Sequence, residues 1–219
     1  MASLSVESAG VRTGSLLAGC VAEHGSASHA WFGSDALLAG PEASRNLADA
    51  IHFLCALHGR HPGVVDHAAT RTVAPAGRIW LASAAAAAAA ERTLLTRLAV
   101  AAGPLPSTPG GGGSETAIQA QRGALATLAQ SDRKGTALGA ALAFASDWAP
   151  VRRRVIEAAA KRLGVETVPH GFGDEAMLRA VADEAGDCER ALLFGAQQLA
   201  LQHRALWDLL EARACARAG

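Results

Sequence analysis

Apolar residues recur along most of the chain at alternating spacings of three and four residues, which is the spacing of one buried face on an α-helix. The pattern is clearest near the C-terminus, in the stripe formed by Leu192, Ala196, Leu199, His203, Leu206 and Leu210. Earlier segments carry equivalent stripes. The pattern predicts an all-α helical bundle, with a core of about four long helices and shorter flanking helices.

Proline and glycine positions set the expected ends of these helices. Residues 1–40 are rich in Gly and Ser, and we expect a weakly structured N-terminal segment there, with one short helix near residues 11–24. Residues 41–219 are predicted to form a single helical-bundle domain. Its expected helices are residues 41–58, a short helix after Pro62, and residues 77–102, 115–131, 135–149, 150–164, 174–185 and 187–216.

A loop rich in Pro and Gly is expected at residues 103–114. Its last part, Gly110–Ser114, has the composition of an engineered flexible linker and also of a natural loop, and the sequence leaves both origins open. The glycines follow a proline-rich stretch rather than a strand. A phosphate-binding loop is therefore not expected.

The composition supports the helical interpretation and excludes other classes. Close to a quarter of the 219 residues are Ala, one of the strongest helix formers, and only 4% are aromatic. A β-sandwich or β-barrel would need more aromatic and β-branched residues. With 50% hydrophobic residues and a net charge of zero, the chain is also unlike a disordered protein.

Charge and apolar content limit the expected partners and location. A net charge of zero argues against nucleic-acid binding, and we expect the dense basic run Arg152–Arg154 to lie on a solvated helix face. The longest apolar run, Ile79–Ala90, is too short to cross a membrane. The four cysteines are far apart, so we expect no disulfide framework and a cytoplasmic protein. Leu17–Cys20 matches the lipobox of bacterial lipoproteins, but the residues before it lack the apolar stretch of an export signal.

Four polar side chains lie in line with the apolar stripes of four predicted helices and so point toward the predicted core. They are His58, Glu91, Arg122 and His203. A buried charge needs a partner, because an unpaired one costs several kcal/mol. One interpretation is structural, with a buried salt bridge between Glu91 and Arg122 and with histidines bonded to backbone carbonyls. The other is a ligand or metal site inside the bundle, built from these four residues.

Histidines also cluster around the expected helix end at residue 58. His58, His61 and His67, with Cys55 one turn before His58, are compatible with a tetrahedral zinc site, although their spacing matches no established zinc motif. The alternative is that these histidines cap or solvate a helix end. A haem with His58 or His203 as its axial ligand also stays open.

No complete catalytic motif is present. Asp49 and His52 have the spacing of half a di-iron carboxylate–histidine motif, but the second half is missing, and on the helical wheel both lie opposite the apolar stripe. The chain has no G-x-S-x-G nucleophile elbow, no Walker loop and no dinucleotide-binding glycine motif after a strand. The sequence therefore assigns no reaction and requires no cofactor.

Three stretches of the sequence, His58–His67, Gly103–Gly110 and Leu206–Arg213, carry a resemblance to known proteins. They resemble an uncharacterised family of small all-helical proteins from alphaproteobacteria, and the resemblance covers most of the chain from about residue 45 onward. It implies an all-helical fold. Because the family has no assigned activity, the resemblance gives no residue a role.

Three functions are compatible with these observations. The first is a binding protein that holds a small ligand or metal at His58, Glu91, Arg122 and His203, with His61 and His67 at one mouth of the site. The second is a non-catalytic scaffold or regulatory module that forms a homodimer or binds a protein partner through an exposed apolar stripe. The third is an oxygenase-like helical enzyme that uses iron, which requires several ligands to converge.

Overall fold

The computed structural model describes residues 12–169 and 171–218, and every regular element in these ranges is helical, which confirms the predicted all-α bundle. In chain order the elements are α1 (Thr13–His24), η1 (Ser26–Ser28), α2 (Ala30–Gly33), η2 (Asp35–Leu37), α3 (Ala43–His58), α4 (Val64–Arg71), α5 (Pro75–Ala102), α6 (Gly111–Ala129), α7 (Thr136–Val151), η3 (Arg152–Ile156), α8 (Glu157–Leu163), α9 (Glu175–Glu184), η4 (Gly186–Cys188) and α10 (Glu189–Ala218). The element η3 is a π-helical turn, and the other η elements are short 3-10 helices.

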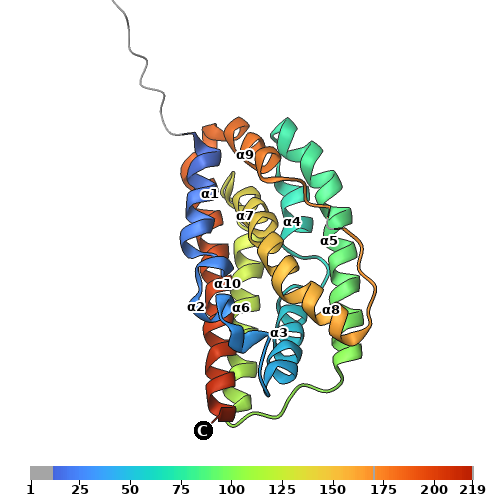
Figure 1. Cartoon of the computed structure of the whole chain (residues 1–219). Coiled ribbons are helices and arrows are strands. Elements are labelled where there is room, and N and C mark those ends of the chain that lie inside the picture. The colour runs from blue at the N-terminus through green and yellow to red at the C-terminus, as the bar shows by residue number, and fades with distance from the viewer. Residues whose placement is uncertain (1–11, 170, 219) are drawn as a thin grey trace, which may run out of the picture.

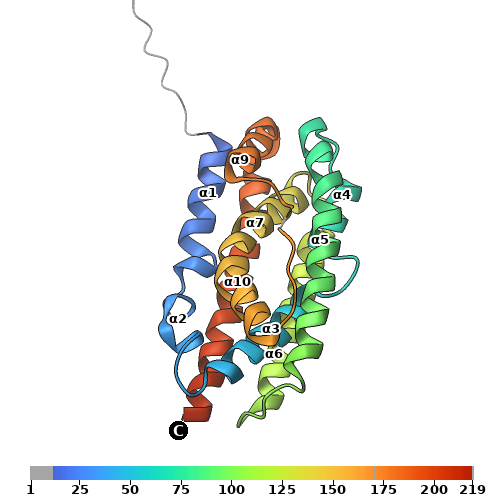
Figure 2. The same cartoon turned by 45° about the vertical axis from the view of Figure 1, so that its right-hand side comes forward.

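Helix α7 lies in the middle of the bundle, and the other helices pack around it (Figures 1 and 2). Its most extensive contact is with α10, and it also touches α1, α4, α6 and α9. Most of its residues are buried, as expected for a helix that is enclosed on all sides. Neither α7 nor any other helix in the described ranges is both long and apolar enough to cross a membrane.

Two glycines allow α7 and α10 to approach each other closely. A Cβ atom on Gly139 of α7 would lie 1.9 Å from the carbonyl oxygen of Leu192 in α10. A Cβ atom on Gly195 of α10 would lie 2.1 Å from the carbonyl oxygen of Thr136 in α7. Each glycine faces the backbone of the other helix, so neither position has room for a side chain.

The chain passes from α7 into α8 without leaving the helix. The sequence predicts a new helix from Pro150, but Pro150 lies inside α7, and the π-helical turn η3 follows it. Proline cannot donate a backbone hydrogen bond to the preceding turn, and a π turn is one way in which a helix accommodates such a disruption. As a result Arg152 stays on the same face as Trp148, one turn earlier, and both are buried.

Residues 12–40 differ from the expected weakly structured segment, whose first part, residues 1–11, lies outside the described residues. Helix α1 agrees with the short helix expected near residues 11–24. Beyond it, Trp31 and Phe32 of α2 are buried against Trp207 of α10, with ring centroids 6.4 and 4.7 Å away. The sequence did not reveal these contacts because the elements that carry them are too short to show a helical period.

Part of the loop expected at residues 103–114 is helical. Helix α6 begins at Gly111, and Gly110 precedes it in the left-handed conformation, with a φ of 73°, which glycine adopts readily. The glycine run joins the helix despite its low helix propensity, and Ser114 and Ile118 in the following turns are buried. Tertiary packing, which supplies most helix stability in proteins, accounts for the earlier start.

The close contact between α7 and α10 predicts opposite effects of alanine at two helical glycines. We expect Gly139→Ala to lower the free energy of unfolding by about 2 kcal/mol or more, because the new methyl group would overlap the Leu192 carbonyl. In Gly123→Ala, the control within α6, the Cβ meets no atom within 4 Å. The better helix propensity of Ala should then raise stability by about 0.5–1 kcal/mol. Urea denaturation measures both changes, and equal effects at the two positions would contradict the close contact.

Candidate functional site

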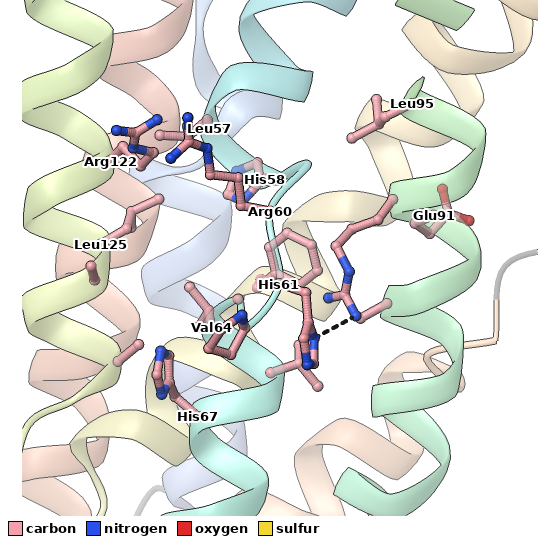
Figure 3. A pocket seen from close by; sticks show the side chains of 18 of the residues that line it. Leu57, His58, Arg60, His61, Val64, His67, Glu91, Leu95, Arg122 and Leu125 are labelled. Atoms are coloured by element: carbon pink, nitrogen blue, oxygen red, sulfur yellow. Dashed lines mark hydrogen bonds between the residues drawn. The ribbon is translucent and has the colours of Figure 1, made fainter. Parts of the chain in front are cut away.

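A pocket with a volume of about 300 Å³ lies between α5 and α6, with the C-terminal end of α3, the following loop and α4 between them (Figure 3). Helix α7 contributes Phe144 and Trp148 to its wall. Further apolar walls come from Leu57, Val64, Val65, Leu95 and Leu125. The polar side chains that line the pocket are those of His58, Arg60, His61, His67, Glu91, Arg92, Gln119 and Arg122.

The pocket brings together residues that the sequence analysis selected from separate helices. His58, Glu91 and Arg122 line it, and so do His61 and His67. Glu91 is buried, as its stripe predicts, whereas His58, Arg122 and His67 are half-buried and His61 is exposed. Spacing along single helices therefore identified side chains that meet in space.

His203 of α10 does not line the pocket but packs behind His58, with the two ring centroids 4.9 Å apart. Its Nδ1 lies 2.6 Å from Oδ2 of Asp147, a buried residue of α7. An ionised carboxylate only accepts hydrogen bonds, so Nδ1 carries the proton and donates it. Asp147 also accepts hydrogen bonds from the backbone N–H and the hydroxyl of Ser26, over 2.8 and 2.5 Å. The expected backbone carbonyl partner of His203 is thus replaced by a carboxylate.

His58 is the last residue of α3, and its ring lies against Phe144 and Trp148, with centroid distances of 5.0 and 5.6 Å. Its Nε2 is buried and has no hydrogen-bond partner among the described residues. Burial, and after it the charge of the neighbouring His203, hold the pKa of His58 well below its ordinary value. The ring is therefore neutral near pH 7 and presents a polar group without a charge.

Glu91 is 4% exposed and forms an ion pair with Arg152 of η3, which is 2% exposed. Trp148 Nε1 donates a hydrogen bond of 3.1 Å to the other carboxylate oxygen, and Arg152 Nη2 donates to the carbonyl of Val168 in the loop before α9. Two expectations are wrong here: the partner of Glu91 is not Arg122, and Arg152 does not lie on a solvated face. The physical reason is the continuous helical course through η3, which keeps Arg152 on the buried side.

Arg122, by contrast, has no carboxylate within 4 Å in the part of the chain that the structure describes. Arg92 donates a hydrogen bond of 2.7 Å to Asp66 and one of 3.4 Å to Nδ1 of His61, the dashed line in Figure 3. Arg60 is exposed and, like Arg122, has no ion pair with a described residue. The pocket therefore carries positive charge that its own carboxylates do not neutralise.

The metal prediction gains no geometric support. His58, His61 and His67 line one pocket, but among residues 12–169 and 171–218 no group of three or more His, Cys, Asp and Glu side chains is arranged to hold a metal ion. Burial also raises the pKa of the Cys55 thiol, which keeps it protonated near neutral pH. Zinc, haem and iron binding stay predictions from the sequence.

Other polar residues are buried although the sequence pattern did not predict it. Asp49, which the helical wheel placed opposite the apolar stripe, is 1% exposed and accepts two hydrogen bonds of 2.9 Å from Arg213 of α10. Arg213 continues the stripe of α10, three residues after Leu210, so the spacing held a signal for it. Asp147 is the only charged residue of α7. Its isolation in such an apolar helix is typical of a buried, paired carboxylate.

The sequence matches a family of unknown function, DUF6975, over residues 21–218. The chain belongs to this family. The match confirms the resemblance to an uncharacterised family and spans every residue of the pocket. A comparison with curated proteins and with solved structures finds no match.

Removing one partner of the Glu91–Arg152 pair would leave the other as an unpaired buried charge. We therefore expect Arg152→Ala to lower the free energy of unfolding by about 3–5 kcal/mol. Arg153→Ala removes the same side chain from the next position, which is exposed, and should change stability by less than about 0.5 kcal/mol. Denaturant unfolding compares the two variants, and similar losses would show that Arg152 is not half of a buried pair.

The lowered pKa of His58 predicts a loss of stability in acid. As the pH falls through 6.5, the unfolded chain takes up a proton at His58 while the native ring resists it, so acid favours unfolding. Between about pH 7 and about pH 5, the free energy of unfolding of the wild type should fall by roughly 1 kcal/mol more than that of His58→Gln. Parallel curves for wild type and His58→Gln would contradict the lowered pKa.

Proposed function

We propose that this protein binds a small organic molecule in the pocket between α5 and α6. The observation that carries the proposal is the convergence of His58, Glu91 and Arg122, which come from three helices and line one cavity with largely apolar walls. Apolar walls with a few convergent polar groups are characteristic of small-ligand sites. A volume of about 300 Å³ is at the small end of the range for such sites, which favours a small ligand.

The polar groups of the pocket differ in how available they are to a ligand. Glu91 is already engaged by Arg152 and Trp148, so it forms part of the wall. His58 and Arg122 have hydrogen-bonding capacity that no described residue uses. His203 would act through His58, whose ring it supports from behind. We therefore assign ligand contact mainly to His58 and Arg122.

Small side chains keep the pocket open. Ala88, Gly123, Ala126 and Ala129 all line it. Protein cores normally pack with few voids larger than a water molecule, and an unfilled cavity lowers stability. Larger apolar residues at these positions would fill the space, so their absence supports an occupant that comes from outside the chain.

A bulky residue at the rim should weaken binding without disturbing the core. Ala126 lines the pocket and is exposed, so a Trp side chain at this position can be accommodated. The probe is the neutral fluorescent dye N-phenylnaphthylamine. We expect it to bind the wild type saturably and to bind Ala126→Trp about tenfold more weakly or worse, because the indole occupies the site.

The matched control is Ala124→Trp, which adds the same side chain to an exposed position of α6 outside the pocket and should keep the wild-type affinity. Melting followed by circular dichroism verifies that both variants are folded. The proposed function fails if the wild type shows no saturable binding, or if both variants bind the dye equally well.

A further inference from the structure

The charges around the pocket are unbalanced. Arg60, Arg92 and Arg122 line it, against the carboxylate of Glu91 in the wall and that of Asp66, which bonds to Arg92. Glu91 is already engaged in a buried ion pair, and Asp66 neutralises Arg92. Arg60 and Arg122 remain without a carboxylate within 4 Å in the described ranges.

The two unpaired guanidinium groups belong to one end of the pocket. In Figure 3, Arg122 of α6 and Arg60 of the loop after α3 both extend toward the end marked by Leu57. Arg122 is half-buried, so its charge is partly removed from water. Such a charge interacts more strongly with a bound anion than a fully solvated arginine does, because the local dielectric is lower.

The inner wall of the pocket, formed by Leu125, Phe144, Trp148, His58 and Glu91, offers no free charge. Leu125, Phe144 and Trp148 supply apolar and aromatic surface. His58 is held in its neutral form by its surroundings, and the carboxylate of Glu91 is paired. This part of the pocket therefore fits an uncharged body, and the arginine end fits an anionic group.

We infer that the ligand is a small amphipathic anion, with its acidic group held by Arg122 and Arg60 and its apolar body against Leu125, Phe144 and Trp148. This inference rests on the proposed function and specifies the class of ligand. The acidic group is a carboxylate, phosphate or sulfonate, because the planar fork of guanidinium donors matches the oxygen atoms of each.

Two dyes with the same aromatic skeleton separate the inference from the proposed function. Anilinonaphthalene sulfonate carries an anionic group, and N-phenylnaphthylamine does not. We expect Arg122→Gln to weaken binding of the sulfonate about tenfold or more beyond any change in binding of the neutral dye, because only the sulfonate loses a charged hydrogen bond. Arg60→Gln, at an exposed position that the fold does not depend on, should act in the same direction.

Arg153→Gln is the charge-matched control, because it removes one exposed arginine away from the pocket and should affect neither dye. Added salt should weaken binding of the sulfonate and not of the neutral dye. If Arg122→Gln and Arg60→Gln leave sulfonate binding unchanged, or weaken both dyes equally, the anion inference is wrong while the pocket stays a binding site. If neither dye binds the wild type, the proposed function itself fails.

A displacement experiment then distinguishes the acidic groups. Octanoate, octyl phosphate and octanol carry the same chain and compete with N-phenylnaphthylamine. We expect at least one of the two anions to displace the dye from the wild type at about tenfold lower concentration than octanol, and to lose this advantage in Arg122→Gln. Whichever anion competes better shows whether the site prefers a carboxylate or a phosphate, and equal displacement by all three compounds would overturn the inference.

Discussion

The enclosure of α7 on all sides is the constraint on which the rest of the structure depends. A helix surrounded by others cannot carry large side chains on every face and still allow its neighbours to pack closely around it. Helix α7 is accordingly rich in Ala, and Gly139 lies where the backbone of α10 approaches it, with Gly195 on the opposite helix. Its two largest residues, Phe144 and Trp148, lie instead at the wall of the pocket. The pocket thus lies beside the part of the central helix that carries its two largest side chains.

Buried ion pairs complement this alanine-rich packing. Small side chains interdigitate little, so they distinguish weakly between alternative positions of one helix against another. Hydrogen-bonded charges tolerate much less displacement. The pair of Glu91 and Arg152 links α5 to η3, and Asp49 with Arg213 links α3 to α10. Asp147 joins α7 to α10 and to the N-terminal segment. Each of these contacts connects elements that are far apart in the sequence.

The same pairing decides what the pocket presents to a ligand. Glu91 would be a free carboxylate in the wall if Arg152 did not reach it, and its negative charge would then offset part of the positive charge of Arg60 and Arg122. His203 is held by Asp147, and its proximity helps to keep His58 uncharged. Of the polar groups that the sequence directs inward, a neutral imidazole and the positive charge of Arg122 are left available. This balance of charge is a consequence of the surrounding core as much as of the lining itself.

The sequence by itself determined the helical class, most helix positions and the inward direction of Glu91 and His203, because all of these depend on local periodicity and on proline and glycine signals. Helical wheels drawn from the sequence also picked out His58, Glu91 and Arg122, which line one pocket. The sequence could not assign the partner of Glu91. A helical wheel gives the direction of a side chain around the axis of its own helix, but not which residue of a neighbouring helix lies opposite it. Only the tertiary structure carried the helix through Pro150 and so buried Arg152. The pocket was likewise decided by the spacing of the helices, which depends on contacts between residues far apart in the chain.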